Sequence, residues 1–169
     1  MKVQASGILI LIACILTGCG KSMKDVAGVY ETSEIKKPFN TRTYDSTTWV
    51  LDLAESGTFT LTKKKFRKFI EDKKYQPRPM DGMEESGAWS LDGGRITITI
   101  KPFVPLLVEE TRDEPYVVTI PLAVQSTGDL VSGANDASGG NSVEGEFSPD
   151  LYLLNTAYDL KGLRFKRVE

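Results

Sequence analysis

The stretch SGAWSLDGGRITITI, residues 86–100, decides the fold class of this chain. Isoleucine alternates with threonine from Ile96 to Ile100, and a period of two is typical of a β-strand with one buried face. Trp89 and Leu91 alternate with polar residues in the same way, and the intervening Asp92–Gly94 is a turn sequence. This stretch therefore predicts a β-hairpin with one apolar face.

The same alternation recurs along the rest of the chain. Trp49, Leu51 and Leu53 share one face of a predicted strand. A turn at Glu55–Gly57 leads into a second strand at Thr58–Thr62. Further strands are predicted at residues 26–31, 116–124, 129–132, 143–147 and 163–168. About eight short strands without a convincing helix favour an all-β domain, an antiparallel meander that closes into a barrel, with a β-sandwich as the alternative.

A glycine stands two residues before a large aromatic residue in AGVYE, residues 27–31, and again in SGAWSLDGGRITITI. Such a glycine lets a strand bend sharply or lets another strand cross close to it. These sequences resemble the small lipocalin-like domains of bacterial envelope lipoproteins, over residues 26–101. The resemblance implies a lipocalin-like barrel of about eight strands.

The same residues also resemble the N-terminal barrel of the copper-homeostasis and envelope-stress lipoprotein family. That family carries a Cys-x-x-Cys motif after its first strand, whereas this chain has threonine, serine, lysine and proline there. The metal and thiol chemistry of the family is therefore not expected here.

The first 19 residues have the order of an export signal followed by a lipidation motif. Lys2 precedes an apolar run at Gly7–Leu16, which is too short to span a bilayer of about 30 Å. Leu16-Thr17-Gly18-Cys19 then resembles the lipobox of bacterial lipoproteins. The resemblance implies cleavage between Gly18 and Cys19, diacylglycerol on the Cys19 sulfur, and usually a further acyl chain such as palmitate. An ordinary cleaved signal or an uncleaved membrane helix is the alternative.

This interpretation divides the chain into a signal peptide (1–18), a lipidated tether (19–25) and a single β-barrel domain (26–169). Cys14 would leave with the signal and Cys19 would be consumed by the lipid, so no disulfide is predicted. Gly20, rather than an aspartate, follows Cys19, which resembles the pattern sent to the outer membrane. A lipid-anchored position in the cell envelope is expected, at the outer membrane facing the periplasm rather than at the cytoplasmic membrane.

Composition excludes several classes of function. Without the signal peptide and its single lysine, 20 lysines and arginines face 23 acidic residues, so nothing points to nucleic acid. Histidine, the commonest general base and transition-metal ligand, is absent. No Gly-x-Ser-x-Gly elbow or phosphate-binding glycine loop is present, and Met80 with Met83 makes a poor copper site. We therefore predict no catalytic residues, no cofactor and no metal.

The segment KKKFRKFIEDKK, residues 63–74, concentrates positive charge in an acidic protein. Phe66, Phe69 and Ile70 have the spacing of one helix face, which predicts a short basic amphipathic helix. The favoured interpretation is instead a long strand end and loop, with the phenylalanines packed on the core and the lysines solvated. The proline-containing residues 75–86 are predicted to be a loop. The candidate contacts with an anionic surface are Lys63, Lys64, Lys65, Arg67 and Lys68.

Two functions fit these observations. The first is a non-catalytic interaction module, held at the membrane by its lipid anchor, that binds an envelope protein or an anionic envelope polymer. The second is a lipocalin-like binder of a small apolar ligand or lipid, with an interior lined by Tyr30, Trp49, Phe59, Trp89 and Phe165. Large aromatic residues tend to fill the interior of an eight-stranded barrel, which favours the interaction module.

Overall fold

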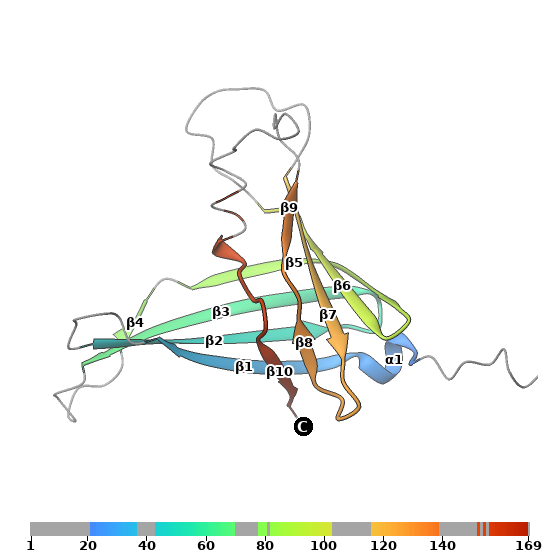
Figure 1. Cartoon of the computed structure of the whole chain (residues 1–169), viewed down its shortest axis with the longest axis horizontal. Helices are drawn as coiled ribbons and strands as arrows, with labels where there is room; N and C mark the ends of the chain where they lie inside the picture. Colours follow the sequence, from blue (N-terminus) through green and yellow to red (C-terminus); the bar gives the residue numbers. More distant parts are fainter. Residues whose placement is uncertain are drawn as a thin grey trace, which may run out of the picture.

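The computed structural model describes residues 21–36, 43–69, 78–80, 82–102, 116–138, 152, 154 and 156–168. The predicted signal peptide, Cys19 and the predicted strand at 143–147 lie outside these residues. In chain order the elements are α1 (Met23–Val26), β1 (Gly28–Lys36), β2 (Thr43–Leu53), β3 (Thr58–Phe69), β4 (Arg78–Pro79), β5 (Met83–Asp92), β6 (Arg95–Ile100), β7 (Val117–Val124), β8 (Leu130–Ser132), β9 (Asp136–Ser138) and β10 (Arg164–Arg167), as labelled in Figure 1.

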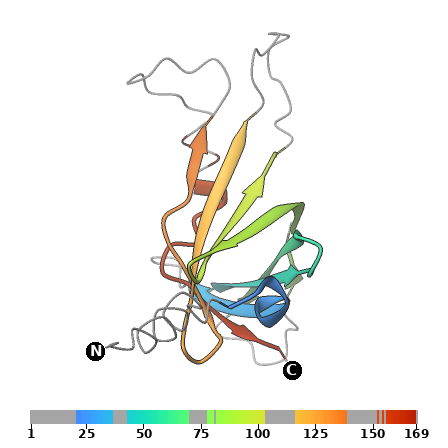
Figure 2. The same ribbon diagram turned by 90° about the vertical axis from the view of Figure 1, so that its right-hand side faces the viewer.

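Eight of these strands close into an antiparallel barrel, which confirms the predicted fold class. The ring runs β1-β2-β3-β5-β6-β7-β8-β10 and returns to β1. Outside the ring, β4 pairs with β3 and β9 pairs with β7. Figure 2 shows β5, β6 and β7 fanning apart as they run away from the end that carries α1.

Both predicted hairpins are present. Asp92 pairs with Arg95 across the turn, and Gly93 and Gly94 there have φ values of 53° and 81°. Two positive φ values in a two-residue loop fit the twist of a β-hairpin, and glycine adopts them without steric cost. In the other hairpin, Leu53 pairs with Phe59 after a turn in which Gly57 donates to the Ala54 carbonyl over 3.0 Å.

The inner faces of the strands form one hydrophobic core. Ile96, Ile98 and Ile100 are fully buried, as their alternation with threonine predicts. Gly87 lies where a Cβ atom would collide with the carbonyl oxygen of Thr99 and would approach the Phe59 ring to 3.0 Å. The predicted close approach at this glycine is therefore confirmed.

The structure corrects the predicted boundaries at two places. The predicted first strand begins at Gly28, and before it Ser22 donates to the Asp25 carboxylate from both its N–H and its hydroxyl, which caps the single turn of α1. The predicted loop at 75–86 is wrong at residues 78–79 and from Met83 onward, which are strand. The reason is that β3 is longer than predicted and supplies a partner, because Lys63 pairs with Met83.

The helical conformation of residues 152, 154, 156 and 157 was not predicted from the sequence. Tyr158 donates its N–H to the Leu154 carbonyl over 3.1 Å at the end of this turn. Leu154, Tyr158 and Leu160 are buried in the hydrophobic core. The chain after the turn therefore covers part of the barrel interior before it enters β10.

Candidate functional site

The charged end of the β2–β3 hairpin is the candidate contact surface. Inside the barrel this hairpin presents an apolar face, where Leu51 pairs with Leu61 and both are fully buried. Because strand side chains alternate, the next residues of β3 on that face are Lys63, Lys65 and Arg67. We call these three residues the basic row.

The basic row begins over an aromatic ring. Lys63 pairs with Trp49 in the strand register, and its Nζ lies 4.6 Å from the centroid of the indole ring. The negative face of an aromatic ring attracts an ammonium group at this distance. Trp49 is only 3% exposed, so this pair marks the boundary between the core and the charged surface.

Asp45 on β2 faces the far end of the basic row. Arg67 donates to its carboxylate from Nε over 2.8 Å and from Nη2 over 3.0 Å. Lys65 Nζ lies 3.7 Å from the same carboxylate. The hydrogen bonds from Arg67, assisted by the charges of Arg67 and Lys65, hold the pKa of Asp45 below its ordinary value. The hydrogen bonds to Asp45 and its negative charge raise the pKa of Arg67. Two cations of the basic row, Lys65 and Arg67, therefore share one carboxylate at this position.

The other two predicted contact residues, Lys64 and Lys68, lie on the opposite face of β3. The amphipathic helix considered for this segment is wrong up to Phe69, and the long strand end is present, since β3 pairs with β2 without a break as far as that residue. Ile70 lies outside the described residues. A short isolated helix is only marginally stable in water, whereas β2 supplies backbone hydrogen-bond partners along β3. Strand pairing therefore prevails over the helical spacing of the phenylalanines.

The basic residues stand far from the N-terminal end of the domain. α1 packs beside the turn of the β2–β3 hairpin, where the Met23 side chain lies close to Gly57. Figure 1 shows α1 and β4 at opposite ends of this hairpin. At a rise of about 3.3 Å per residue, Lys68 lies roughly 33 Å along β3 from Thr58. The charged end therefore projects away from the point where the chain enters the domain.

The five residues predicted to line a cavity share one packed core. Their exposed fractions are Tyr30 1%, Trp49 3%, Phe59 3%, Trp89 4% and Phe165 0%. The Tyr30 hydroxyl donates to the Val26 carbonyl over 2.6 Å, and Trp89 Nε1 donates to the Ala54 carbonyl over 2.9 Å. Their side chains, with their polar atoms paired, fill the interior at this level of the barrel.

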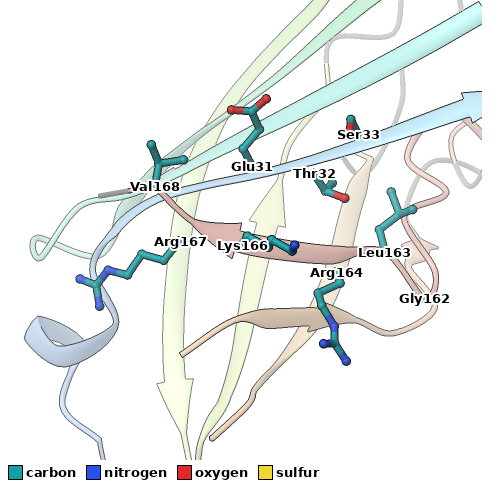
Figure 3. A pocket seen from close by; sticks show the side chains of 9 residues that line it. All are labelled: Glu31, Thr32, Ser33, Gly162, Leu163, Arg164, Lys166, Arg167 and Val168. Atoms are coloured by element: carbon teal, nitrogen blue, oxygen red, sulfur yellow. The ribbon is translucent and has the colours of Figure 1, made fainter. Parts of the chain in front are cut away.

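Sequence reasoning missed a groove in the barrel wall between β1 and β10 (Figure 3). Its volume is about 710 Å³. It is lined by Glu31, Thr32, Ser33, Gly162, Leu163, Arg164, Lys166, Arg167 and Val168. No periodic signal reveals such a groove, because it forms where two strands that are distant in the sequence part from each other.

Comparison of the chain with protein-family models, with curated proteins and with solved structures finds no match. Among the residues that the structure describes, no group of three or more acidic or thiol side chains is arranged to hold a metal ion. No helix in the described part of the chain combines the length and apolar character required to cross a bilayer.

Proposed function

We propose that this protein is a lipid-anchored lipoprotein of the cell envelope that acts as a non-catalytic interaction module. Its acidic partner, an envelope protein or an anionic polymer, binds to the basic row and to Lys64 and Lys68 on the other face of β3. The observation that carries this proposal is the position of these residues, on a strand end that projects beyond the apolar core of the barrel.

The orientation of the domain supports a partner away from the membrane. Lys21, the first described residue, follows the proposed lipidation site Cys19 after one residue, and α1 begins at Met23. The lipid anchor would therefore hold the α1 end of the barrel at the membrane, which we propose is the outer membrane. The basic end of β3 would then extend into the periplasm, where a partner can reach both of its faces.

The filled interior favours this function over the binding of a small apolar ligand. The five large side chains that would line a cavity all belong to a single hydrophobic cluster. An eight-stranded barrel holds a ligand only where its inward side chains leave room. Bulky residues at these five positions instead stabilise the barrel as a rigid support for the hairpin.

Retention on immobilised long-chain polyphosphate tests the proposal. We would compare the Cys19→Ser protein with a variant that also carries Lys63→Gln, Lys64→Gln, Lys65→Gln and Lys68→Gln. Arg67 is kept because it binds Asp45. The expected result is retention at low salt that falls steeply with ionic strength in the parent and is lost in the variant, because exposed charges are screened by salt.

A matched control neutralises four exposed basic residues elsewhere, Lys24, Arg95, Lys101 and Lys161. This control should be retained like the parent. Equal retention of both quadruple variants would reject β3 as the contact surface. Binding to phosphatidylglycerol vesicles that persists without the β3 charges would instead assign the electrostatic contact to the membrane.

A further inference from the structure

The groove between β1 and β10 is a break in the pairing of the barrel wall. β1 pairs with β2 along its whole length, from Gly28 to Lys36. Its pairs with β10 are only Tyr30 with Arg167 and Glu31 with Lys166. Beyond Glu31 the described residues of β10 leave β1, and the groove opens at that point.

Backbone groups of β1 point into this groove. Val168 donates its N–H to the Val29 carbonyl over 2.8 Å, so the backbone groups of Val29 are directed toward β10. In an antiparallel strand this direction alternates, so Glu31 and Ser33 also direct their N–H and C=O toward β10. Glu31 meets Lys166, but no strand pair joins Ser33 to β10 within the described ranges.

The opposite wall of the groove presents a second strand edge. Ser132 donates its N–H to the Leu163 carbonyl over 3.0 Å, so the backbone groups of Leu163 face β8. Those of the next residue, Arg164, therefore face the groove, by the same alternation. Arg164 would be the ladder partner of Ser33 if β1 and β10 stayed together, and their separation leaves two edges facing one space.

The side chains around these edges carry an excess of positive charge. Arg164, Lys166 and Arg167 line the groove against a single acidic residue, Glu31. Arg164 and Lys166 are exposed, and Figure 3 shows their side chains beside the groove. Leu163 adds an apolar, half-buried surface to the same wall.

We propose that this groove binds an extended, acidic segment of another protein by strand addition to β1. An extended peptide supplies the N–H and C=O groups that an open strand edge lacks, which gives affinity, while its side chains give specificity. Acidic residues at alternate positions of the segment would meet Arg164 and Lys166 on the outer face. This site is separate from the basic row and does not depend on the function proposed for it.

The test measures fluorescence anisotropy of a labelled octapeptide in which glutamate alternates with valine, with the full-length chain in detergent. Ser33→Pro removes the N–H donor on the groove side while leaving the ladder to β2 intact. Ser33→Ala, which keeps that donor, is the matched control. We expect unchanged binding for Ser33→Ala, and binding weakened about fivefold or more for Ser33→Pro, the loss of a hydrogen bond.

Two further probes keep the proposal testable if Ser33→Pro fails to fold. Arg164→Glu combined with Lys166→Glu should abolish binding of the glutamate peptide and permit binding of its lysine analogue. Methylation of every second peptide nitrogen removes N–H donors and leaves the charge of the peptide unchanged. Two such peptides can be made, methylated at the odd or at the even positions, and the one that loses the N–H groups facing β1 should not bind. Equal affinity for methylated and unmethylated peptides would overturn strand addition in favour of simple charge attraction. Self-association of the chain through this edge, with no peptide bound, would also overturn the proposal.

Discussion

The Tyr158 hydroxyl donates a hydrogen bond to Glu85 Oε1 over 2.7 Å and thereby ties the C-terminal segment to β5. Glu85 pairs with Leu61 in the strand register, so it lies on the inner face of the sheet. Burial and the neighbouring carboxylate raise the pKa of Tyr158. This bond joins residues far apart in the sequence, where the barrel wall is widening.

We predict that Tyr158→Phe lowers the free energy of unfolding by about 1–3 kcal/mol, because a partly buried carboxylate loses its donor while the ring packing is kept. Urea denaturation at pH 7 measures the effect. Glu85→Gln serves as the control, since its amide oxygen still accepts the bond, and it should cost less. A larger loss for Glu85→Gln would show that the carboxylate has a role beyond this contact.

Because of the raised pKa of Tyr158, we predict that the stability of the fold falls at alkaline pH. A tyrosine whose pKa is raised in the folded state contributes stability that is fully present below its unfolded pKa of about 10 and is lost as pH rises beyond that value. The wild-type urea midpoint should therefore fall more between pH 9 and pH 11 than that of Tyr158→Phe. Parallel declines in both proteins would contradict the assignment.

Because of the lowered pKa of Asp45, we predict that the stability of the fold falls at acidic pH. Arg67 lowers the pKa of this carboxyl in the folded state, so its contribution is present above an unfolded pKa of about 3.9 and is lost as pH falls below it. Asp45→Asn should therefore lose less stability between pH 7 and pH 3 than the wild type, measured by urea midpoints. An equal loss of stability in Asp45→Asn and in the wild type would contradict this assignment.

Gly87 predicts a steric penalty inside the barrel wall. A methyl group there would meet the Thr99 carbonyl and the Phe59 ring, so we expect Gly87→Ala to cost about 1–3 kcal/mol. Thermal unfolding followed by circular dichroism measures the loss. Ser90→Ala, at an exposed site of the same strand, should stay within about 0.5 kcal/mol of the wild type. A neutral Gly87→Ala would mean that β6 moves aside easily.

Cleavage before Cys19 and lipidation of Cys19 would determine the mass of the mature protein. We expect the native membrane form to begin at Cys19 and to carry acyl chains on it, and Cys19→Ser to lose both the lipid and membrane attachment. Mass spectrometry of the intact protein and of its N-terminal tryptic peptide measures this. A free thiol at Cys19, or an N-terminus at Met1, would reject the lipoprotein assignment.

The sequence predicted those parts of the fold that depend on local alternation. The isoleucines of β6 and the hairpin glycines determine a strand and a turn without reference to the rest of the chain, and both are confirmed. All five large aromatic residues are buried, and for Trp49, Phe59 and Trp89 the alternation of the sequence predicts this inner position. Whether the barrel interior is filled or contains a cavity depends on how side chains from different strands pack together. The alternation within one strand does not predict this.

The missed features depend on contacts between distant segments. Leu154, Tyr158 and Leu160 become buried only because the barrel offers them an interior, and the groove exists only because β10 leaves β1 after two pairs. The division of the basic residues between the two faces of β3 could have been predicted from the sequence. Every second residue of a strand lies on the same face, so the positions that follow Phe59 and Leu61 on the inner face are those of the basic row.

Arg167 links the two ends of the described chain. Its guanidinium donates to the carbonyls of Asp25 over 3.1 Å and of Ala27 over 2.6 Å, and it lies 5.9 Å from the centroid of the Tyr30 ring. In a chain held at Cys19, any mechanical load from the membrane would enter the barrel beside these bonds. The last strand would then share this tension with β1, because the bonds from Arg167 hold the chain at the end of α1, directly before β1 begins.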